Sequence, residues 1–297
     1  MKIIFSRKGF DSSYGKMPSP ILPDGTIMSF PIPSDGTGAR RLASIRLNPK
    51  YDHIKIAEDL SNGRITGDTT VHMDPDLSAD TLPRIDSWRP TFGQVSSAQG
   101  HLKKMGVGTG DLFLFFGWFR QVGQHAGKWI FVPDAPNLHV LFGWMQIGEI
   151  IEAGSSPESL IGRDYPWLKD HPHAHTGYPA SNTIYAASRG LYHGKRLMLT
   201  GTIGAGLFGK FHRNLQLTTP SKPGARYNRS HWTLPESFFK NGRSKLSYHL
   251  DVIPRISFGE ASFEVVARGQ EFIYPCDEND SDVIDWAMSL ITRYSTK

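Results

Sequence analysis

Two short segments of the chain place acid–base or metal-binding side chains at alternate positions. In the first, His72, Asp74 and Asp76 lie two residues apart, and in extended backbone such side chains share one face. One imidazole and two carboxylates can act as an acid–base pair or hold a hard divalent cation. An Asp-Pro turn with exposed carboxylates is the alternative, because Asp74 precedes a proline. We therefore take His72 and Asp74 as candidate catalytic residues.

The second segment is a run of histidines at the same spacing, His171, His173 and His175. Imidazoles on one edge can bind a transition metal, act as a general base or contact a phosphate, and a polar loop is the alternative. Asn182 and Tyr185 follow closely and can donate or accept hydrogen bonds at the edge of a base. We expect His171 and His173 to be catalytic and Asn182 and Tyr185 to contact a nucleotide.

A polar loop follows the first predicted strand, Lys2 to Phe5. Arg7 can hold a phosphate through two parallel hydrogen bonds, Lys8 adds a point charge, and Ser12 adds a hydroxyl donor. Asp11 can serve as a base or bind a metal. The alternative is a solvated turn in which Asp11 pairs with Arg7.

Two further segments suit contact with nucleobases. Residues 92–105 are predicted to form a helix capped by Thr91, and its Gln94 can read the edge of a purine or pyrimidine. A solvated helix face explains Gln94 equally well. Residues 226–232 interleave cations with aromatic side chains, a pattern that suits phosphate contact and base stacking. The alternative is a basic surface loop anchored in the core by Trp232.

The elements that must position these residues are mainly strands. Residues 112–119, 128–132 and 138–151 are apolar runs, which predict neighbouring strands buried on both faces. The first and third share a Phe-Gly-Trp sequence, and a glycine inside a strand marks a bulge or a close backbone approach. Residues 281–292 carry one apolar stripe and predict the last helix. We expect a single α+β domain over residues 1–297, built on a curved, partly barrel-like, mostly antiparallel sheet with a few flanking helices.

Composition excludes several classes of protein. The formal net charge of +5 favours a polyanionic partner, and the lone Cys276 excludes internal disulfides and cysteine-based zinc clusters. The start of the chain lacks the pattern of a signal peptide, and no apolar stretch is long enough for a membrane span, so a cytoplasmic location is expected. Phosphate-binding P-loop, dinucleotide-binding and Gly-x-Ser-x-Gly signatures are all missing.

Several motifs, in order along nearly the whole chain, resemble the nucleotide modification associated domain 3 family. The motifs are Ser6-Arg-Lys-Gly-Phe-Asp-Ser-Ser13, Ser19-Pro-Ile21, Pro31-Ile-Pro33, His72-x-Asp-Pro-Asp-Leu77, Gly110-Asp-Leu-Phe-Leu-Phe-Phe-Gly-Trp-Phe-Arg120, His171-Pro-His173 and Asn182-Thr-Ile-Tyr185. The resemblance implies a part in phage or bacterial pathways that hypermodify DNA bases, and it names no reaction. The site candidates that it carries over are Arg7, Lys8, Asp11, Ser12, His72, Asp74, Gln94, His171 and His173.

Together these features predict an enzyme that acts on a modified nucleobase or nucleotide, with DNA or a nucleotide as its partner. Arg7 and Lys8 would hold phosphate, and Asp11 or His72 would act as base. If a divalent metal is used, the ligands are sought among His72, Asp74, His171 and His173. Two alternatives stay open. One is a non-catalytic reader of modified bases with a PUA-like barrel, and the other is a metal-dependent nuclease that restricts modified DNA.

Overall fold

Two long strands form the centre of the fold. The structure is a computed structural model, and it describes residues 1–200, 203–266, 269 and 271–296. They are β7 (Leu112–His125) and β9 (Leu138–Glu152), which pair antiparallel. The first five residues of β7 are all buried, as expected for a strand covered on both faces. The apolar runs of the sequence therefore become the middle of the sheet.

Seven further strands extend this central sheet in the order β18-β1-β7-β9-β10-β6, with β2, β8 and β13 attached to β7 or β9. Their bounds are β1 (Lys2–Arg7), β2 (Ser19–Ile21), β6 (Thr91–Gln94), β8 (Lys128–Phe131), β10 (Thr183–Ala187), β13 (Ala205–Leu207) and β18 (Glu271–Pro275). β1 and β2 run parallel to β7, and the other pairings are antiparallel.

The two glycines of the repeated Phe-Gly-Trp sequence lie where the backbone is closely approached. A Cβ atom on Gly117 would come within 2.8 Å of the carbonyl oxygen of Lys8, and one on Gly143 within 2.6 Å of Leu77. The two copies lie on paired strands, with a register shift between Phe115 and Phe116. The repeat thus marks neighbouring strands of one sheet, as the sequence predicted.

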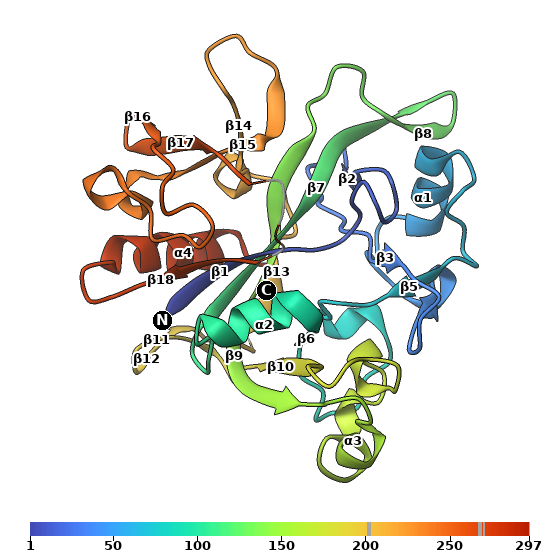
Figure 1. The fold of residues 1–297 in the computed structure, drawn as a ribbon. Coiled ribbons are helices and arrows are strands. Elements are labelled where there is room, and N and C mark those ends of the chain that lie inside the picture. The colour runs from blue at the N-terminus through green and yellow to red at the C-terminus, as the bar shows by residue number, and fades with distance from the viewer. Residues whose placement is uncertain (201–202, 267–268, 270, 297) are drawn as a thin grey trace.

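Smaller sheets and four α-helices flank the centre in the described part of the chain. Figure 1 shows α4 and the β14–β17 sheet on one side of the central strands, and α1 with the β3–β5 sheet on the other. The helices are α1 (His53–Ser61), α2 (Ser96–Lys104), α3 (Glu158–Asp164) and α4 (Ser281–Tyr294). The strands are β3 (Ile32–Pro33), β4 (Arg40–Arg41), β5 (Thr70–His72), β11 (Leu191–His193), β12 (Arg196–Leu199), β14 (Thr218–Pro220), β15 (Tyr227–Pro235), β16 (Arg255–Ser257) and β17 (Glu260–Glu264).

The expected α+β class and mostly antiparallel pairing are confirmed, but the sheet does not close into a barrel. The terminal strands β6 and β18 share no backbone pairing among the described residues. Only side chains bridge them, since the amide of Gln94 donates to Glu271 Oε1 at 2.6 Å. None of the described helices is long and apolar enough to cross a lipid bilayer.

Three local predictions are corrected by the structure. The predicted helix over residues 92–105 is wrong at its start, because Thr91–Gln94 form β6 and α2 begins at Ser96. Phe92 pairs with Tyr185 of β10 and is fully buried, so tertiary packing overrides the helical pattern. Helix α1 was missed, although Asp52 caps it by accepting from Ile54 N and Lys55 N. Strand β15 was missed as well.

Candidate active site

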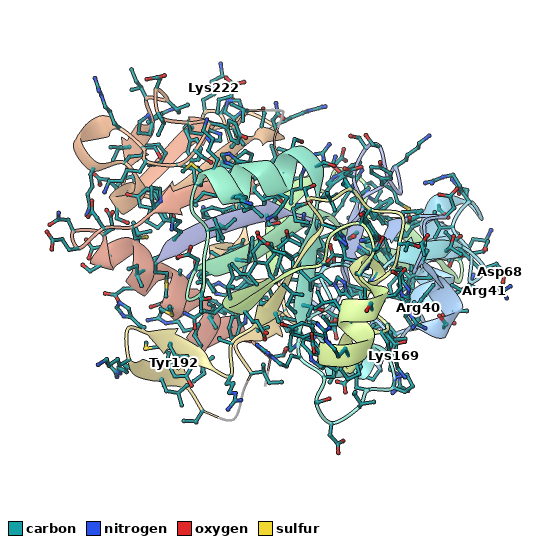
Figure 2. All side chains as sticks on the ribbon, turned by 60° about the horizontal axis from the view of Figure 1, so that its bottom comes forward. Arg40, Arg41, Asp68, Lys169, Tyr192 and Lys222 are labelled. Atoms are coloured by element: carbon teal, nitrogen blue, oxygen red, sulfur yellow. The ribbon has the colours of Figure 1, made fainter. Side chains whose placement is uncertain are left out.

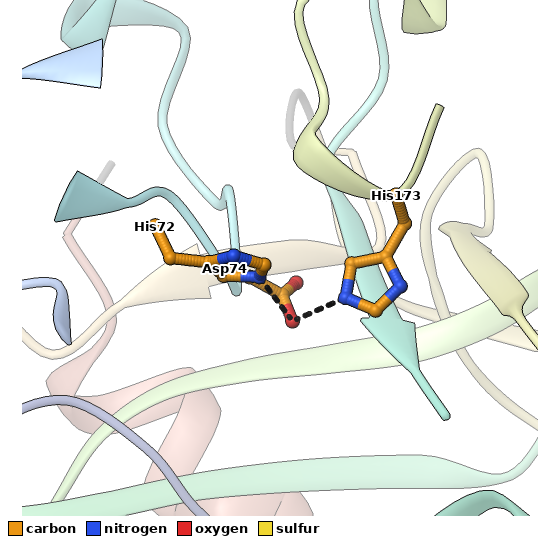
Figure 3. A group of neighbouring side chains, drawn as sticks. All are labelled: His72, Asp74 and His173. Carbon is orange, nitrogen blue, oxygen red and sulfur yellow. Dashed lines mark ion pairs between the residues drawn. The ribbon is translucent and has the colours of Figure 1, made fainter. Parts of the chain in front are cut away.

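Three histidine side chains converge on one carboxylate. The Nε2 atoms of His72 and His173 lie 3.8 and 3.7 Å from Asp74 Oδ2, and His171 Nε2 lies 3.5 Å from Asp74 Oδ1. Figure 3 shows the rings of His72 and His173 on either side of the Asp74 carboxylate. The Asp74 side chain is only 7% exposed. The segment of His72 and Asp74 and the histidine segment of His171 and His173 therefore meet in one place, although they are more than ninety residues apart in the chain.

Strand β6 supplies the floor of this cluster. The backbone N–H of Gly93 donates to Asp74 Oδ1 at 2.8 Å. A Cβ atom at Gly93 would come within 2.3 Å of the His173 ring, so the ring lies directly on the strand backbone. Position 93 consequently tolerates no side chain while His173 keeps this place.

A second contact fixes the loop that carries the two later histidines. Arg40 of β4 pairs with Asp170, which directly precedes His171. Figure 2 shows Arg40 near Lys169, the neighbour of Asp170, on one side of the molecule. After Asp170, residues Pro172–Ala174 form a 3₁₀ turn. This turn brings His171 and His173 to the same carboxylate. The sequence had suggested that an extended backbone would place them on one edge.

Hydrogen bonds at the outer ring nitrogens determine the tautomers of two histidines. Asn182 donates from Nδ2 to the carbonyl oxygens of His173 and Gly154, which fixes the orientation of its amide. Asn182 Oδ1 lies 2.7 Å from His173 Nδ1, so this nitrogen carries the proton and the lone pair of Nε2 faces Asp74. His171 is the reverse case, because its Nδ1 accepts from the His173 backbone N–H and its Nε2 carries the proton.

The charges in the cluster follow from burial and from these contacts. Burial lowers the pKa of His173 to about 4, against the opposing charge of Asp74. Burial by itself would raise the pKa of Asp74, but the facing imidazoles of His171 and His72, and then the charge of His173, outweigh burial and lower it. Near neutral pH the cluster therefore holds an ionised carboxylate and a neutral His173, the protonation states that metal binding requires.

The geometry fits a bound transition metal. The ligand atoms of His72, Asp74 and His173 all lie within 4.8 Å of one another. Nitrogen–oxygen separations of 3.7 and 3.8 Å are too long for ordinary hydrogen bonds. They are close to the roughly 3.4 Å between two ligands bound tetrahedrally at about 2.0–2.1 Å. Two imidazoles and one carboxylate form a ligand set used by mononuclear zinc and non-haem iron enzymes.

His171 fits a different role from the other two imidazoles. Its Nε2 is buried and has no hydrogen-bond partner within normal distance among the described residues. Because that nitrogen carries the proton, it cannot bind a metal in this tautomer, and it instead directs an N–H at Asp74 Oδ1. We expect His171 to position the carboxylate rather than to hold an ion.

Comparison with known protein families identifies the family of this chain. The family model described as nucleotide modification associated domain 3 matches residues 2–275. The chain belongs to this family. Comparisons with curated proteins and with solved structures found no match. The matched range includes every candidate residue of the cluster, and of the four described helices only α4 lies outside it.

Two other residues near the imidazole cluster have structural partners. Asp76 lies 2.6 Å from Arg84 Nη2 and is only 3% exposed, so it forms a buried ion pair instead of facing His72. Tyr178 stacks on His173 with ring centroids 4.3 Å apart. Burial, then the charge of Asp74, raises the pKa of Tyr178 to about 12, so its phenol stays protonated.

A cavity of about 290 Å³ reaches the cluster. Asp74 and Asp76 lie in its wall, together with apolar side chains that include Phe30 and Phe142. Polar side chains, among them Arg46 and Asn48, make up much of the rest of the lining. A concave site that combines apolar surface with polar groups can bind a small molecule. This cavity is the best candidate for the substrate site of this family member.

The opening polar loop is divided between two other places. Lys8 donates to Glu271 Oε1 at 3.0 Å, the same oxygen that accepts from Gln94. Gln94 and Glu271 line a cavity of about 620 Å³ with His101. Tyr185 donates to Gln99 at 2.9 Å.

Arg7 and Ser12 line a separate cavity with Arg229. Asp11 accepts from the backbone N–H groups of Ser13 and Tyr14 and so stabilises its own turn. The imidazole cluster thus brings together His72, Asp74, His171, His173 and Asn182. Arg7, Lys8, Asp11, Ser12, Gln94 and Tyr185 make their contacts elsewhere.

Sequence reasoning missed two residues of these sites. Glu271 was not among the candidates, although a carboxylate entering a buried apolar strand is itself a signal. Gly93 was not singled out, because the predicted helix concealed its place under His173.

Proposed function

We propose that this family member is a metal-dependent enzyme of DNA base hypermodification, acting on a nucleobase or nucleotide. His72, Asp74 and His173 are the metal ligands, and His171 positions the Asp74 carboxylate. The observation that carries the proposal is the convergence of three imidazoles on one buried carboxylate, with the His173 lone pair aimed inward. Membership of a nucleotide modification family supplies the substrate class.

The chain's own residues would have separable tasks. A bound divalent metal would polarise a substrate oxygen or lower the pKa of a bound water. Asn182 would hold the His173 ring in its ligating tautomer, and Gly93 would keep the Asp74 carboxylate in place. The cavity beside Asp74 would admit the substrate and exclude bulk water.

Nucleoside mass spectrometry of DNA tests the proposal. The gene in its natural source is left intact, deleted, or replaced by His173→Asn or His175→Asn. His175 follows in the same segment and lies outside the cluster, so it provides a matched control. We expect deletion and His173→Asn to change the same nucleoside, and His175→Asn to leave it unchanged.

The alternatives give different results in this experiment and in separate binding and cleavage assays. A reader of modified bases leaves all nucleosides unchanged on deletion and retains binding in His173→Asn. A nuclease leaves nucleosides unchanged but cleaves modified DNA in a reaction that a chelator stops. An unchanged nucleoside profile in the deletion strain would therefore overturn the modification function.

A further inference from the structure

A third cavity, of about 270 Å³, lies where β1 ends beside β15. Arg7 reaches it from the end of β1, and Arg229 reaches it from β15. Asn228 and Ser230, on either side of Arg229, also line it. Its residues are distinct from those of the imidazole cluster and from those of the cavity beside Asp74.

Neither guanidinium group of this cavity has a carboxylate partner. Among the described residues (1–200, 203–266, 269 and 271–296), Arg7 and Arg229 form no ion pair. None of the residues in the gaps between these ranges is Asp or Glu. Asp11 accepts from two backbone N–H groups through its Oδ1 atom and is not a lining residue of the cavity. Both arginines are half-buried, and partly buried cations without a counter-charge are unfavourable unless an anion joins them.

The walls of the cavity hold one arginine in place and are backed by buried aromatic side chains. The Arg229 guanidinium lies 4.0 Å from the Trp118 ring centroid, a cation–π contact that fixes its orientation. Burial, then the charge of Arg7, lowers the pKa of Arg229, against the opposing charge of Asp11. Phe116 and Trp232 are fully buried behind the cavity.

His139 adds a neutral donor to the same wall. Its Nδ1 accepts from Trp232 Nε1 at 3.0 Å, so its Nε2 carries the proton. Burial, then the charges of Arg229 and Arg7, lowers the pKa of His139 to about 3. The cavity therefore combines two arginines, one of them oriented by Trp118, with a neutral histidine, and it has no ionised acid in its lining.

We infer that this cavity binds a phosphate group between Arg7 and Arg229. A carboxylate is satisfied by one bidentate guanidinium, whereas the additional oxygens of a phosphate can accept from both. The amide of Asn228 and the hydroxyl of Ser230 can form hydrogen bonds with the nucleoside attached to that phosphate. The phosphate belongs either to a free nucleotide or to the backbone of a DNA strand.

Equilibrium binding with defined probes tests this site in the full chain. The probes are deoxycytidine 5′-monophosphate, deoxycytidine without its phosphate, and a fluorescein-labelled single-stranded DNA oligonucleotide. The variants are Arg229→Gln and the control Arg226→Gln, which removes the same charge from an exposed residue in the same hairpin. Figure 2 shows Lys222, in the turn of this hairpin, at the rim of the molecule. Thermal unfolding of each variant confirms that it folds.

We expect Arg229→Gln to weaken phosphate-dependent binding by about tenfold or more, and Arg226→Gln to change it less than about twofold. Loss confined to the mononucleotide identifies a free nucleotide as the ligand. Loss confined to the oligonucleotide, with a salt slope reduced by about one, identifies backbone phosphate. Equal effects of the two variants on both probes, or equal binding of nucleoside and nucleotide, would overturn the site.

The conservative variant and the imidazole cluster separate this inference from the proposed enzyme function. Arg229→Lys keeps the charge but loses the planar fork, so its binding should fall between those of wild type and Arg229→Gln. Asp74→Asn should keep full phosphate binding even where it abolishes modification, because Asp74 lies outside this cavity. Phosphate binding lost in Asp74→Asn would contradict a separate site.

Discussion

Asp74 and Asp76 lie only two residues apart, and their buried carboxylates are stabilised by different partners. Asp76 is paired with the guanidinium of Arg84 at 2.6 Å, and the pair is almost fully buried. Asp74 faces three imidazoles at 3.5–3.8 Å, and none of them makes an ordinary hydrogen bond to it. The permanent cation gives Asp76 a closed structural pair, whereas the imidazoles leave Asp74 available to a further partner. The difference separates a residue that stabilises the fold from one that can do chemistry.

The largest effect should come from breaking the structural pair. Arg84→Ala leaves the Asp76 charge buried and unpaired, so we expect the free energy of unfolding to fall by about 3–5 kcal/mol. Chemical denaturation measures this. The control is Arg41→Ala, since Arg41 and Asp68 form an exposed pair, which Figure 2 labels at the edge of the molecule. Removing it should cost less than about 1 kcal/mol. Similar losses in the two variants would contradict the assigned role of Asp76.

The next effect concerns the other aspartate. Asp74→Asn removes a metal ligand but can still accept the Gly93 N–H, so metal affinity should fall by about 100-fold or more while stability changes by less than about 1 kcal/mol. Titration with Zn²⁺ and Fe²⁺, followed by metal analysis of the protein, measures the affinity. Asp80→Asn is the control, because Asp80 is an exposed residue of the same cavity. Unchanged affinity in Asp74→Asn would show that the cluster is not a metal site.

A smaller effect is expected one contact further out. Asn182→Ala removes the partner of His173 Nδ1, and metal affinity should fall by about tenfold. Asn182→Asp keeps an acceptor for that N–H but loses the donors to the carbonyl oxygens of His173 and Gly154. We expect it to retain metal affinity while losing about 1–3 kcal/mol of stability. If both variants lose affinity equally, Asn182 acts through the loop structure rather than through the tautomer.

The sequence indicated which residues form the cluster, but it did not indicate how they are arranged in space. Alternate spacing drew attention to His72, Asp74, His171 and His173, which the structure brings together, and also to Asp76 and His175, which lie outside the cluster. It could not show that His171 and His173 face Asp74 from a 3₁₀ turn, because tertiary packing sets where that turn lies relative to Asp74. The same limit applies to the fold.

The apolar run of β7 was readable because burial on both faces leaves a continuous signal. Strand β6 was not readable, since Phe92 is held by aromatic side chains far away in the sequence. Arg7 and Lys8 were expected together, but Arg7 lines the cavity of Arg229 whereas Lys8 pairs with Glu271. Residues adjacent in a chain therefore need not share a site.

The smallest effect tests a histidine whose neighbours are permanent cations. The folded-state pKa of His139 is about 3, below its ordinary value of 6.5, so the unfolded chain binds the proton more readily. Its contribution to stability is therefore complete above pH 6.5 and is lost as pH falls toward 3. Between pH 7 and pH 5, the free energy of unfolding should fall less steeply in His139→Asn than in the wild type, by at most about 1.4 kcal/mol per pH unit. Denaturant unfolding measures this.

The Asn side chain can still accept from Trp232, so this variant removes the titration while keeping the hydrogen bond. Parallel pH profiles for His139→Asn and wild type would show that the imidazole is not held neutral beside Arg7 and Arg229.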